Sequence, residues 1–328
     1  MGPTIKDVAR RAEVSLSTVS AVLNGSAPAS QATRLKVLAA VAELGYEPNS
    51  QARNLKRRRS HAVGLIVPDV LNPFFALVAE GVGDELRTHD YLLVLCSTDF
   101  DERREASYAR LLRATRLDGI VHLSSTGLPP AELHELARIS KIVTVDERVH
   151  GLAAPFVGSD NRRGARAAAE LALARGHRRF GIIAGPTGLW TAEQRLAGYR
   201  EALAAGGIDP DTVPTVPGDY RLESGRQAAA QLLPQEPTVI LAANDLMAVG
   251  CLQHALGAGL RVPHDLSVVG YDDVPLATVV TPALTTVRQP AREMGRVAAK
   301  LLLDGIEERD VPESVDLAPE LVERESLA

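Results

Sequence analysis

The residues best suited to chemistry lie at the start of the chain, where Thr4 and Ser15 each precede a short amphipathic segment. Hydroxyl side chains in such positions cap helices, because they accept hydrogen bonds from free backbone amides. Asp7 follows Thr4 by three residues, which fits a capping box. Two short helices with a tight turn between them are typical of a helix-turn-helix, whose second helix enters the DNA major groove. Residues 4–24 therefore predict a DNA-binding unit.

The start of the second helix is the part that meets base edges in this motif. Leu16, Ser17 and Ala21 occupy that surface, and none can form a bidentate base contact, each of which is worth about 1–3 kcal/mol of discrimination. We expect Leu16 and Ala21 to contact thymine methyl groups or merely to fit. We expect Ser17 to make one weakly selective hydrogen bond, so DNA shape must add to the selectivity.

Other polar residues of this region are candidates for contacts with DNA, chiefly with phosphate. For Thr4 and Ser15, capping alone and capping combined with phosphate contact both remain open. The further candidates are Lys6, Thr18, Ser20, Asn24 and Arg34. A third helix is expected from about Ser30 to Leu44, with Leu35, Leu38, Val41 and Ala42 buried and Gly45 at its end. The basic run Arg57–Arg59 is either a solvated linker or a further DNA contact.

Charge is divided unevenly along the chain. The net charge of the 328 residues is −5. Residues 1–60 nevertheless carry ten Lys and Arg against four Asp and Glu, whereas residues 61–328 carry 26 against 37. A basic head on an acidic body indicates a DNA-binding module joined to a part that does not bind DNA.

Other compositional features narrow the class of protein. No apolar run approaches the ~18 residues that a membrane helix needs. The chain starts with a polar, charged segment, unlike a signal peptide. This start predicts a cytoplasmic protein that is nucleoid-associated when it is bound to DNA. Cys96 and Cys251 lie far apart in apolar contexts, so we expect two buried thiols, without a disulfide or a metal site.

From Ala62 onward, apolar runs alternate with Ala-rich amphipathic segments. Continuous apolar strands separated by helices predict parallel sheets covered on both faces, hence two α/β lobes. The expected strands are Ala62–Val67, Tyr91–Cys96, Gly119–Leu123, Lys141–Val145, Phe180–Ala184, Thr238–Ala242, Leu266–Gly270 and the short run Glu313–Leu317.

With these elements in place, the chain resembles the LacI/GalR family of bacterial transcriptional regulators over essentially its whole length. The headpiece motifs are Thr4-Ile-Lys-Asp-Val-Ala9, Val14-Ser15, Thr18-Val-Ser20 and Val22-Leu-Asn24. Gly45-Tyr46-x-Pro48-Asn49 and Ala52-Arg53-x-Leu55 are similar to the hinge of that family. The body motifs are Asn72-Pro-Phe-Phe75, Asp118-Gly119-Ile120, Asp160-Asn161, Gly176-His177, Arg195-x-x-Gly198-Tyr199, Asn244-Asp245-x-Met247-Ala248 and Gly270-Tyr271-Asp272.

The resemblance implies a hinge helix at about residues 49–57 that orders against DNA. Two such helices from a homodimer would lie in the minor groove and insert Leu55 between base steps, which costs a few kcal/mol and bends the duplex. Ala52 would permit close helix approach, and Asn49, Arg53 and Lys56 complete the hinge residues expected at DNA. A core position is the alternative for Leu55.

The resemblance also implies a body like a periplasmic sugar-binding protein, with a small polar ligand between two lobes. The candidate ligand-binding residues are Asn72, Phe74, Phe75, Asp146, Asp160, Trp190, Arg195, Tyr220, Asn244, Asp245 and Asp272. One of Phe74 and Phe75 is expected in the core. Asn244 and Asp245 are ligand contacts or helix caps, and Trp190 lines the cleft or anchors a half-exposed loop.

The expected organisation is a headpiece at residues 1–60 and a ligand-sensing domain at 61–328. Lobe 1 would comprise about 61–160 and 291–319, and lobe 2 about 161–290 and 320–328. The function this implies is a repressor that binds a two-fold operator as a homodimer, controlled by a sugar or sugar derivative. A purine- or nucleoside-dependent corepressor type and an activator are the alternatives.

Enzyme classes are less favoured. The chain has no GxxxxGK[ST] phosphate loop, no GxSxG elbow and no HExxH pair. No cofactor or metal site is therefore expected. A plain sugar-binding protein is disfavoured by the basic head.

Overall fold

A computed structural model describes residues 3–24, 29–46, 59–115, 117–123, 141–149 and 151–328. The chain divides into two compact units, residues 1–60 and 61–328, which we call the headpiece and the body. No helix within the described ranges is long and apolar enough to cross a membrane.

The described part of the headpiece contains three helices: α1 (Ile5–Ala12), α2 (Leu16–Asn24) and α3 (Gln31–Leu44). Val8, Val19 and Val37, one from each helix, are fully buried against one another at the centre. The turn between α1 and α2 passes through Glu13, whose φ of 55° lies in the left-handed region and ends α1. The expected helix-turn-helix is thus present, and burial of apolar side chains from all three helices holds it together.

The buried face of α3 differs from the one expected. Leu35 and Leu38 are 63% and 46% exposed, and Ala42 is also exposed. The side chains that face the core are those of Val37, Ala40, Val41 and Leu44. This set repeats at the i, i+3, i+4, i+7 spacing of a single helix face. The prediction that Leu35, Leu38 and Ala42 are buried was therefore wrong, because these residues do not lie on the helix face that contains Val37 and Ala40.

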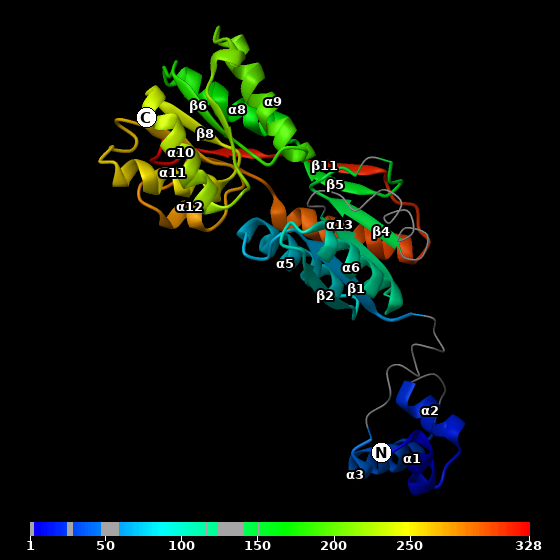
Figure 1. Ribbon diagram of the computed structural model, residues 1–328. Helices are drawn as coiled ribbons and strands as arrows, with labels where there is room; N and C mark the ends of the chain where they lie inside the picture. The colour runs from blue at the N-terminus through cyan, green and yellow to red at the C-terminus, as the bar shows by residue number, and fades with distance from the viewer. Residues whose placement is uncertain (1–2, 25–28, 47–58, 116, 124–140, 150) are drawn as a thin grey trace. The chain divides into compact units, whose positions relative to one another are not determined.

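The first lobe of the body is built on a six-stranded parallel sheet in the order β11-β5-β4-β3-β1-β2. The strands are β1 (Ala62–Val67), β2 (Leu92–Ser97), β3 (Gly119–His122), β4 (Lys141–Val145), β5 (Phe156–Ser159) and β11 (Ser314–Leu317). Helices α5 (Pro73–Arg87) and α13 (Ala291–Ile306) pack together, and α6 (Glu102–Ala114) contacts β1 (Figure 1).

Alternating residues of β1 place these helices on opposite faces of the sheet. Leu65 belongs to the core beneath α5 and α13, whereas its neighbour Ile66 packs with Leu112 of α6. Successive side chains of a strand point to opposite faces, so an apolar strand of this kind requires cover on both. Close packing of α5 on α13 depends on Gly81 and Gly295, since a Cβ at either would lie 2.0–2.1 Å from a backbone oxygen of the other helix.

The second lobe is built on a parallel sheet in the order β7-β6-β8-β9. Its strands are β6 (Phe180–Ala184), β7 (Thr215–Pro217), β8 (Val239–Ala242) and β9 (Ser267–Val269). One pair of helices, α8 (Asn161–Ala174) with α9 (Trp190–Ala205), packs on one face, and another, α10 (Leu222–Leu232) with α11 (Asp245–Gly257), packs on the other (Figure 1). The shorter elements are α12 (Leu276–Val279), η1 (Pro210–Thr212) and η2 (Leu233–Gln235).

The chain passes between the lobes more than once. It enters the second lobe after β5, and it returns to the first after β10 (Thr286–Arg288) to form α13 and β11. It then re-enters the second lobe to form β12 (Glu320–Val322), which pairs antiparallel with β10. All eight expected strands are present with small shifts of their ends, whereas β5, β7, β10 and β12 were not expected. Cys96 and Cys251 are free and buried, as predicted.

Candidate DNA interface and effector site

The beginning of α2 is held by hydroxyl groups. Ser15 Oγ accepts a hydrogen bond from the Thr18 backbone amide at 3.1 Å, which confirms the cap. The same oxygen lies 2.8 Å from the hydroxyls of Ser17 and Thr18. Leu16 is 44% exposed although it is apolar, and Ser17 is exposed beside it. Ala21, one turn later, is half-buried. The structure thus brings the three residues expected at base edges onto one helical segment with outward access.

The other headpiece candidates flank this segment. The Asp7 carboxylate accepts hydrogen bonds from the Thr4 amide at 2.9 Å and the Thr4 hydroxyl at 2.6 Å, which lowers the pKa of Asp7. Lys6 and Arg34 are exposed, whereas Thr18 and Ser20 are half-buried. Asn24 ends α2. The hinge candidates Asn49, Ala52, Arg53, Leu55 and Lys56, with the hinge helix itself, lie outside the described residues.

In the body, polar residues gather where the parallel strands end. Asp146 directly follows β4, Asn161 follows β5, and Asn244 and Asp272 follow β8 and β9. All four are buried. The carboxyl ends of parallel strands are where open α/β sheets bind their ligands, because loops with free polar groups meet there. The arrangement therefore supplies a set of hydrogen-bonding groups around the junction of the two lobes.

Arg195 of α9 lies at the centre of this set and is only 3% exposed. Its Nε donates to Asn161 Oδ1 at 2.7 Å, and one of its terminal nitrogens donates to the Ala243 carbonyl at 2.5 Å. The same nitrogen lies 3.3 Å from Asp272 Oδ1. The guanidinium also lies 4.1 Å above the ring of Tyr271, in a geometry suited to a cation–π contact. These partners fix the guanidinium in one orientation.

Asp272 is held from a second side by Gln289, whose amide donates to Asp272 Oδ1 at 2.8 Å. Burial raises the pKa of Asp272 to about 7, and Arg195 opposes this increase. Asp272 also has a positive φ of 108°, which is unusual for a residue with a side chain. Strained backbone of this kind is concentrated at functional sites.

Asp146 and Glu147 contribute two adjacent buried carboxyl groups from the first lobe. Glu147 accepts hydrogen bonds from the Thr191 amide at 3.3 Å and from the Thr191 hydroxyl. Burial raises the pKa of Glu147 to about 7, and the nearby Asp146 adds to that increase. Burial likewise raises the pKa of Asp146 to about 6, against the attraction of Arg195.

The loops after β7 and β8 supply further groups. The Tyr220 hydroxyl lies 3.4 Å from the Thr191 hydroxyl. Asn244 caps α11 by accepting from the Met247 amide at 2.9 Å, and its own amide donates to the Tyr220 carbonyl at 2.9 Å. Asp245 is fully buried and accepts from the Val274 amide and the Thr286 hydroxyl at 2.8 and 2.6 Å. Asn244 and Asp245 therefore hold the loops of the second lobe together.

Trp190 is the first residue of α9 rather than part of a loop, and it is half-buried. Its ring meets that of Phe156 of the first lobe edge to face, with centroids 5.9 Å apart. The Arg148 guanidinium lies 4.0 Å from the Phe156 centroid and 5.3 Å from the Trp190 centroid. This aromatic pair is a second contact between the lobes.

The remaining candidates lie at the margins of the buried set. Asn72 caps α5 by accepting from the Phe74 amide at 3.0 Å. Phe74 and Phe75 both belong to the apolar core of the first lobe, where one had been expected. Asp160 is exposed and caps α8 by accepting from the Arg163 amide at 3.0 Å. It lines an open groove of arginines and glutamates on α8 and α9 rather than the buried set.

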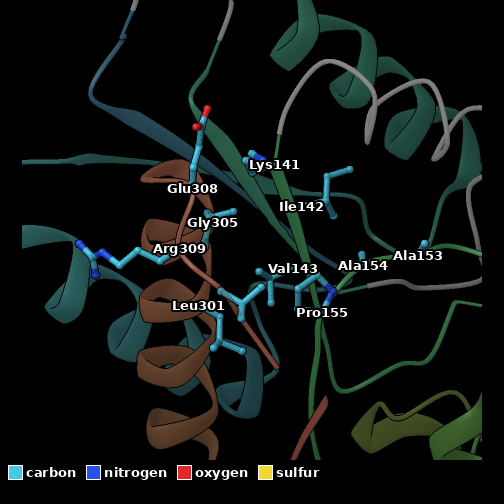
Figure 2. Close-up of a pocket in the computed structure, with 12 residues that line it drawn as sticks. Lys141, Ile142, Val143, Ala153, Ala154, Pro155, Leu301, Gly305, Glu308 and Arg309 are labelled. Carbon is cyan, nitrogen blue, oxygen red and sulfur yellow. The ribbon is translucent and has the colours of Figure 1, made fainter. Parts of the chain in front are cut away.

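A pocket of about 460 Å³ lies elsewhere, between β4 and the end of α13 (Figure 2). Lys141, the first residue of β4, marks this as the amino end of the sheet, opposite the usual ligand side of such folds. The Arg309 side chain extends away from β4 and pairs with Asp304 and Glu307. Because the Arg309 guanidinium is already paired with carboxylates, this pocket is a weaker candidate for binding a polar ligand than the buried polar residues around Arg195.

Four residues of the buried set were not singled out from the sequence: Glu147, Asn161, Thr191 and Gln289. Asn161 was quoted only within a motif, next to the chosen Asp160. The sequence signal that could have indicated them was their position near the ends of expected strands or in the segment that forms α9. Contact with residues 17–44 positions away cannot be inferred from that signal alone.

Comparison with known proteins gives consistent findings. Residues 4–49 match the family described as bacterial regulatory proteins, lacI family, and residues 169–327 match a periplasmic binding protein-like domain. The HTH-type transcriptional repressor CytR of Escherichia coli (strain K12) is 37% identical over 310 residues, which cover 94% of this chain and 91% of that protein.

Two solved structures extend the likeness. The transcriptional regulator CelR–cellobiose complex is 36% identical, with a TM-score of 0.74 and coverage of 99% of both chains. The lac repressor dimer bound to operator and the anti-inducer ONPF is 28% identical, with a TM-score of 0.90 and coverage of 100% of this chain and 99% of that one.

Proposed function

The chain belongs to the LacI family of bacterial transcriptional regulators, and from this premise we propose that it represses transcription by binding a two-fold operator as a homodimer. A small polar ligand bound between the lobes of the body sets the affinity for DNA. The protein acts in the bacterial cytoplasm and is nucleoid-associated while bound. The single observation that carries the ligand-binding half of this proposal is the buried Arg195–Asp272 pair at the junction of the lobes.

On the DNA side, we assign the base-facing surface to Leu16, Ser17 and Ala21. The exposure of Leu16 supports this assignment, because covering an exposed apolar side chain with a binding partner is energetically favourable. The residues proposed to reach phosphate are Thr4, Lys6, Ser15, Thr18, Ser20, Asn24 and Arg34. The hinge residues proposed to enter the minor groove are Asn49, Ala52, Arg53, Leu55 and Lys56.

On the ligand side, we assign hydrogen-bonding roles to Arg195 and Asp272 and proximity to the ligand to Asp146 and Tyr220. Arg195 supplies donors and Asp272 supplies acceptors, a combination that suits a polyhydroxylated ligand such as a sugar. The cellobiose in the structure of the similar regulator supports this class. Asn72, Asn244 and Trp190 would line the site, whereas Phe74 and Phe75 pack in the core, Asp160 caps α8 and Asp245 holds loops of the second lobe together.

The switch follows from linkage between two binding events. A ligand that contacts both lobes stabilises one arrangement of them, and DNA stabilises one arrangement of the paired headpieces. Coupling free energies of about 1–3 kcal/mol, or 5–150-fold in affinity, are typical of such systems. If the two preferred arrangements differ, the ligand is an inducer. If they coincide, it is a corepressor.

The test uses the full-length chain and an operator selected from random duplexes. Operator affinity is measured by fluorescence anisotropy at fixed salt, with and without each of a panel of sugars and nucleosides. Trp190, the single tryptophan, reports binding in parallel. We expect at least one compound that quenches Trp190 saturably and changes the operator Kd at least fivefold. Loss of both effects in Asp272→Asn is expected, and compounds that bind without any effect on operator Kd would contradict the proposal.

A further inference from the structure

Buried acidic groups outnumber buried basic groups where the lobes meet. Asp146, Glu147 and Asp272 are each at least 94% buried. Arg195 is the one buried arginine or lysine within the described ranges of the chain. An ionised carboxylate in a poorly solvated site is costly unless it is paired with a cation or well supplied with hydrogen-bond donors. The protein alone therefore leaves this site short of positive charge.

Arg195 forms an ion pair with Asp272, and its hydrogen bonds go to the neutral oxygens of Asn161 and Ala243. Among the described residues, the hydrogen-bond donors to Glu147 are the neutral amide and hydroxyl of Thr191. Asp146 Oδ1 is buried, and no donor among the described residues lies within hydrogen-bond distance of it. Since Asp146 interacts electrostatically with Arg195 and Asp272, it belongs to the same site. The unmet requirement is thus for a donor at Asp146 Oδ1, next to the carboxyl group of Glu147.

The missing partner is better supplied by an organic ligand than by a metal ion. Among the residues that the structure describes, no group of three or more His, Cys, Asp or Glu side chains is arranged to hold a metal. An amino group differs from a hydroxyl in offering several N–H donors and, when protonated, a positive charge. Hydrogen bonds between charged partners are about twice as strong as neutral ones.

We propose that the effector of this protein presents an amino group to the carboxylate of Asp146, beside that of Glu147. The inference rests on the proposed function, because it places the group in the same ligand site. Two sources supply such N–H donors: an amino sugar, whose amine also carries a positive charge when protonated, and a nucleoside whose base carries an exocyclic amino group, which stays neutral. Burial also raises the pKa of both carboxyl groups, as expected for acids that lack their cationic partner.

The test compares pairs of ligands in which an amino group is replaced by a hydroxyl or oxo group. Full-length protein is titrated by calorimetry at pH 8 with D-glucosamine against D-glucose, and with cytidine and adenosine against uridine and inosine. Wider sets of amino sugars and aminated nucleosides, each with its hydroxyl or oxo counterpart, follow in a melting screen. We expect the amino member of at least one pair to bind at least tenfold more tightly. The pair that shows the preference identifies the source.

Variants connect the preference to the two carboxylates. Glu147→Gln and Asp146→Asn should each reduce the amino-over-oxo preference at least fivefold. Glu170→Gln removes one carboxylate from the exposed surface of α8 and should leave the preference unchanged. Circular dichroism and operator binding show whether each variant is folded, and the ligand pairs test the wild-type chain in any case.

The possible outcomes separate the two proposals. If unaminated compounds bind as tightly as their amino counterparts or more tightly, the amino-group inference is overturned while the ligand site stands. A preference that survives both carboxylate variants overturns it as well. If no compound of either kind binds, the inference and the proposed function fail together.

Discussion

The Glu147 carboxylate and Thr191 connect the two lobes of the body. Both carboxylate oxygens lie 3.3 Å from the Thr191 backbone nitrogen, and the Thr191 hydroxyl donates to one of them. Glu147 follows β4 of the first lobe, whereas Thr191 lies in the first turn of α9 in the second. The carboxylate therefore receives two donors, and these face it from the amino end of a helix, where negative charge is stabilised.

Replacing Thr191 by Val should destabilise the body without changing its shape. The substitution keeps the volume but removes the hydroxyl donor, so the buried Glu147 loses one of its two partners. We expect the free energy of unfolding to fall by about 1–3 kcal/mol, measured by urea denaturation of the full-length chain. Thr278→Val removes an exposed hydroxyl of the same lobe and should change it by less than about 0.5 kcal/mol. Equal effects of the two substitutions would contradict the proposed contribution of the interlobe contact.

Stability should depend on pH through the buried carboxyl groups. The pKa of Glu147 rises from its ordinary value of 4.5 to about 7. The pKa values of Asp272 and Asp146 rise from 3.8 to about 7 and about 6. A carboxyl group with a raised pKa in the folded state stabilises the fold while it stays protonated. That contribution is lost as the pH rises from the unfolded-state pKa through the folded-state pKa.

We therefore expect the ligand-free protein to lose stability as the pH rises from about 4 to about 7, at up to about 1.4 kcal/mol per pH unit for each carboxyl group that stays protonated in the folded state. Urea denaturation across this range measures the slope. Glu147→Gln cannot ionise and should give a shallower slope, whereas Glu170→Gln should reproduce the wild type. A slope that is unchanged in Glu147→Gln would show that Glu147 does not titrate in this range.

Arg195 should be essential to the body in a way that a surface arginine is not. Arg195→Met leaves Asp272 buried without its cation, which we expect to cost about 3–5 kcal/mol of unfolding free energy. Arg195→Lys keeps a charge but loses the planar donor geometry that reaches Asn161, so it should retain more stability while losing ligand binding. Arg166→Met, at an exposed helical ion pair, should cost no more than about 1 kcal/mol. Chemical denaturation and calorimetric titration with the identified effector give the two quantities.

Operator choice should respond to Ala21 specifically. Ala21→Arg adds a side chain able to contact guanine in the major groove, and such contacts contribute about 1–3 kcal/mol of base discrimination. Ala39→Arg adds the same charge at an exposed position of α3. Both variants should raise general DNA affinity, but only Ala21→Arg should change the preferred sequence in a binding selection. If both select the wild-type sequence, Ala21 does not face the bases.

Much of the fold could be predicted because it depends on local patterns. Val63–Val67 and Val239–Ala242 are continuous apolar runs, and such runs are typical of strands buried on both faces. The short strand Thr215–Pro217 has no such run, and β10 and β12 form a small ribbon with exposed positions, so these were missed. The face of α3 was missed for another reason, because helical spacing and residue size indicated different residues.

The candidate site could be predicted only in part. Arg195 and Asp272 were found because each belongs to a motif of the family. The pairing of Glu147 with Thr191 joins residues 44 positions apart in different lobes, and neither belongs to a motif. The packing of Phe75 in the core, the helix cap at Asp160 and the loop contacts of Asp245 depend on burial and hydrogen-bond partners, which a linear sequence does not display.

Regulation by the effector requires coupling between the headpiece and the ligand site, and reciprocity offers the most direct measurement of this coupling. The Kd of the effector is measured by calorimetry for the full-length protein alone and for its saturated complex with the selected operator. Thermodynamic linkage requires the ratio of these two values to equal the factor by which the effector changes the operator Kd. We predict equal factors of at least five. An effector Kd that is the same with and without operator would contradict the account.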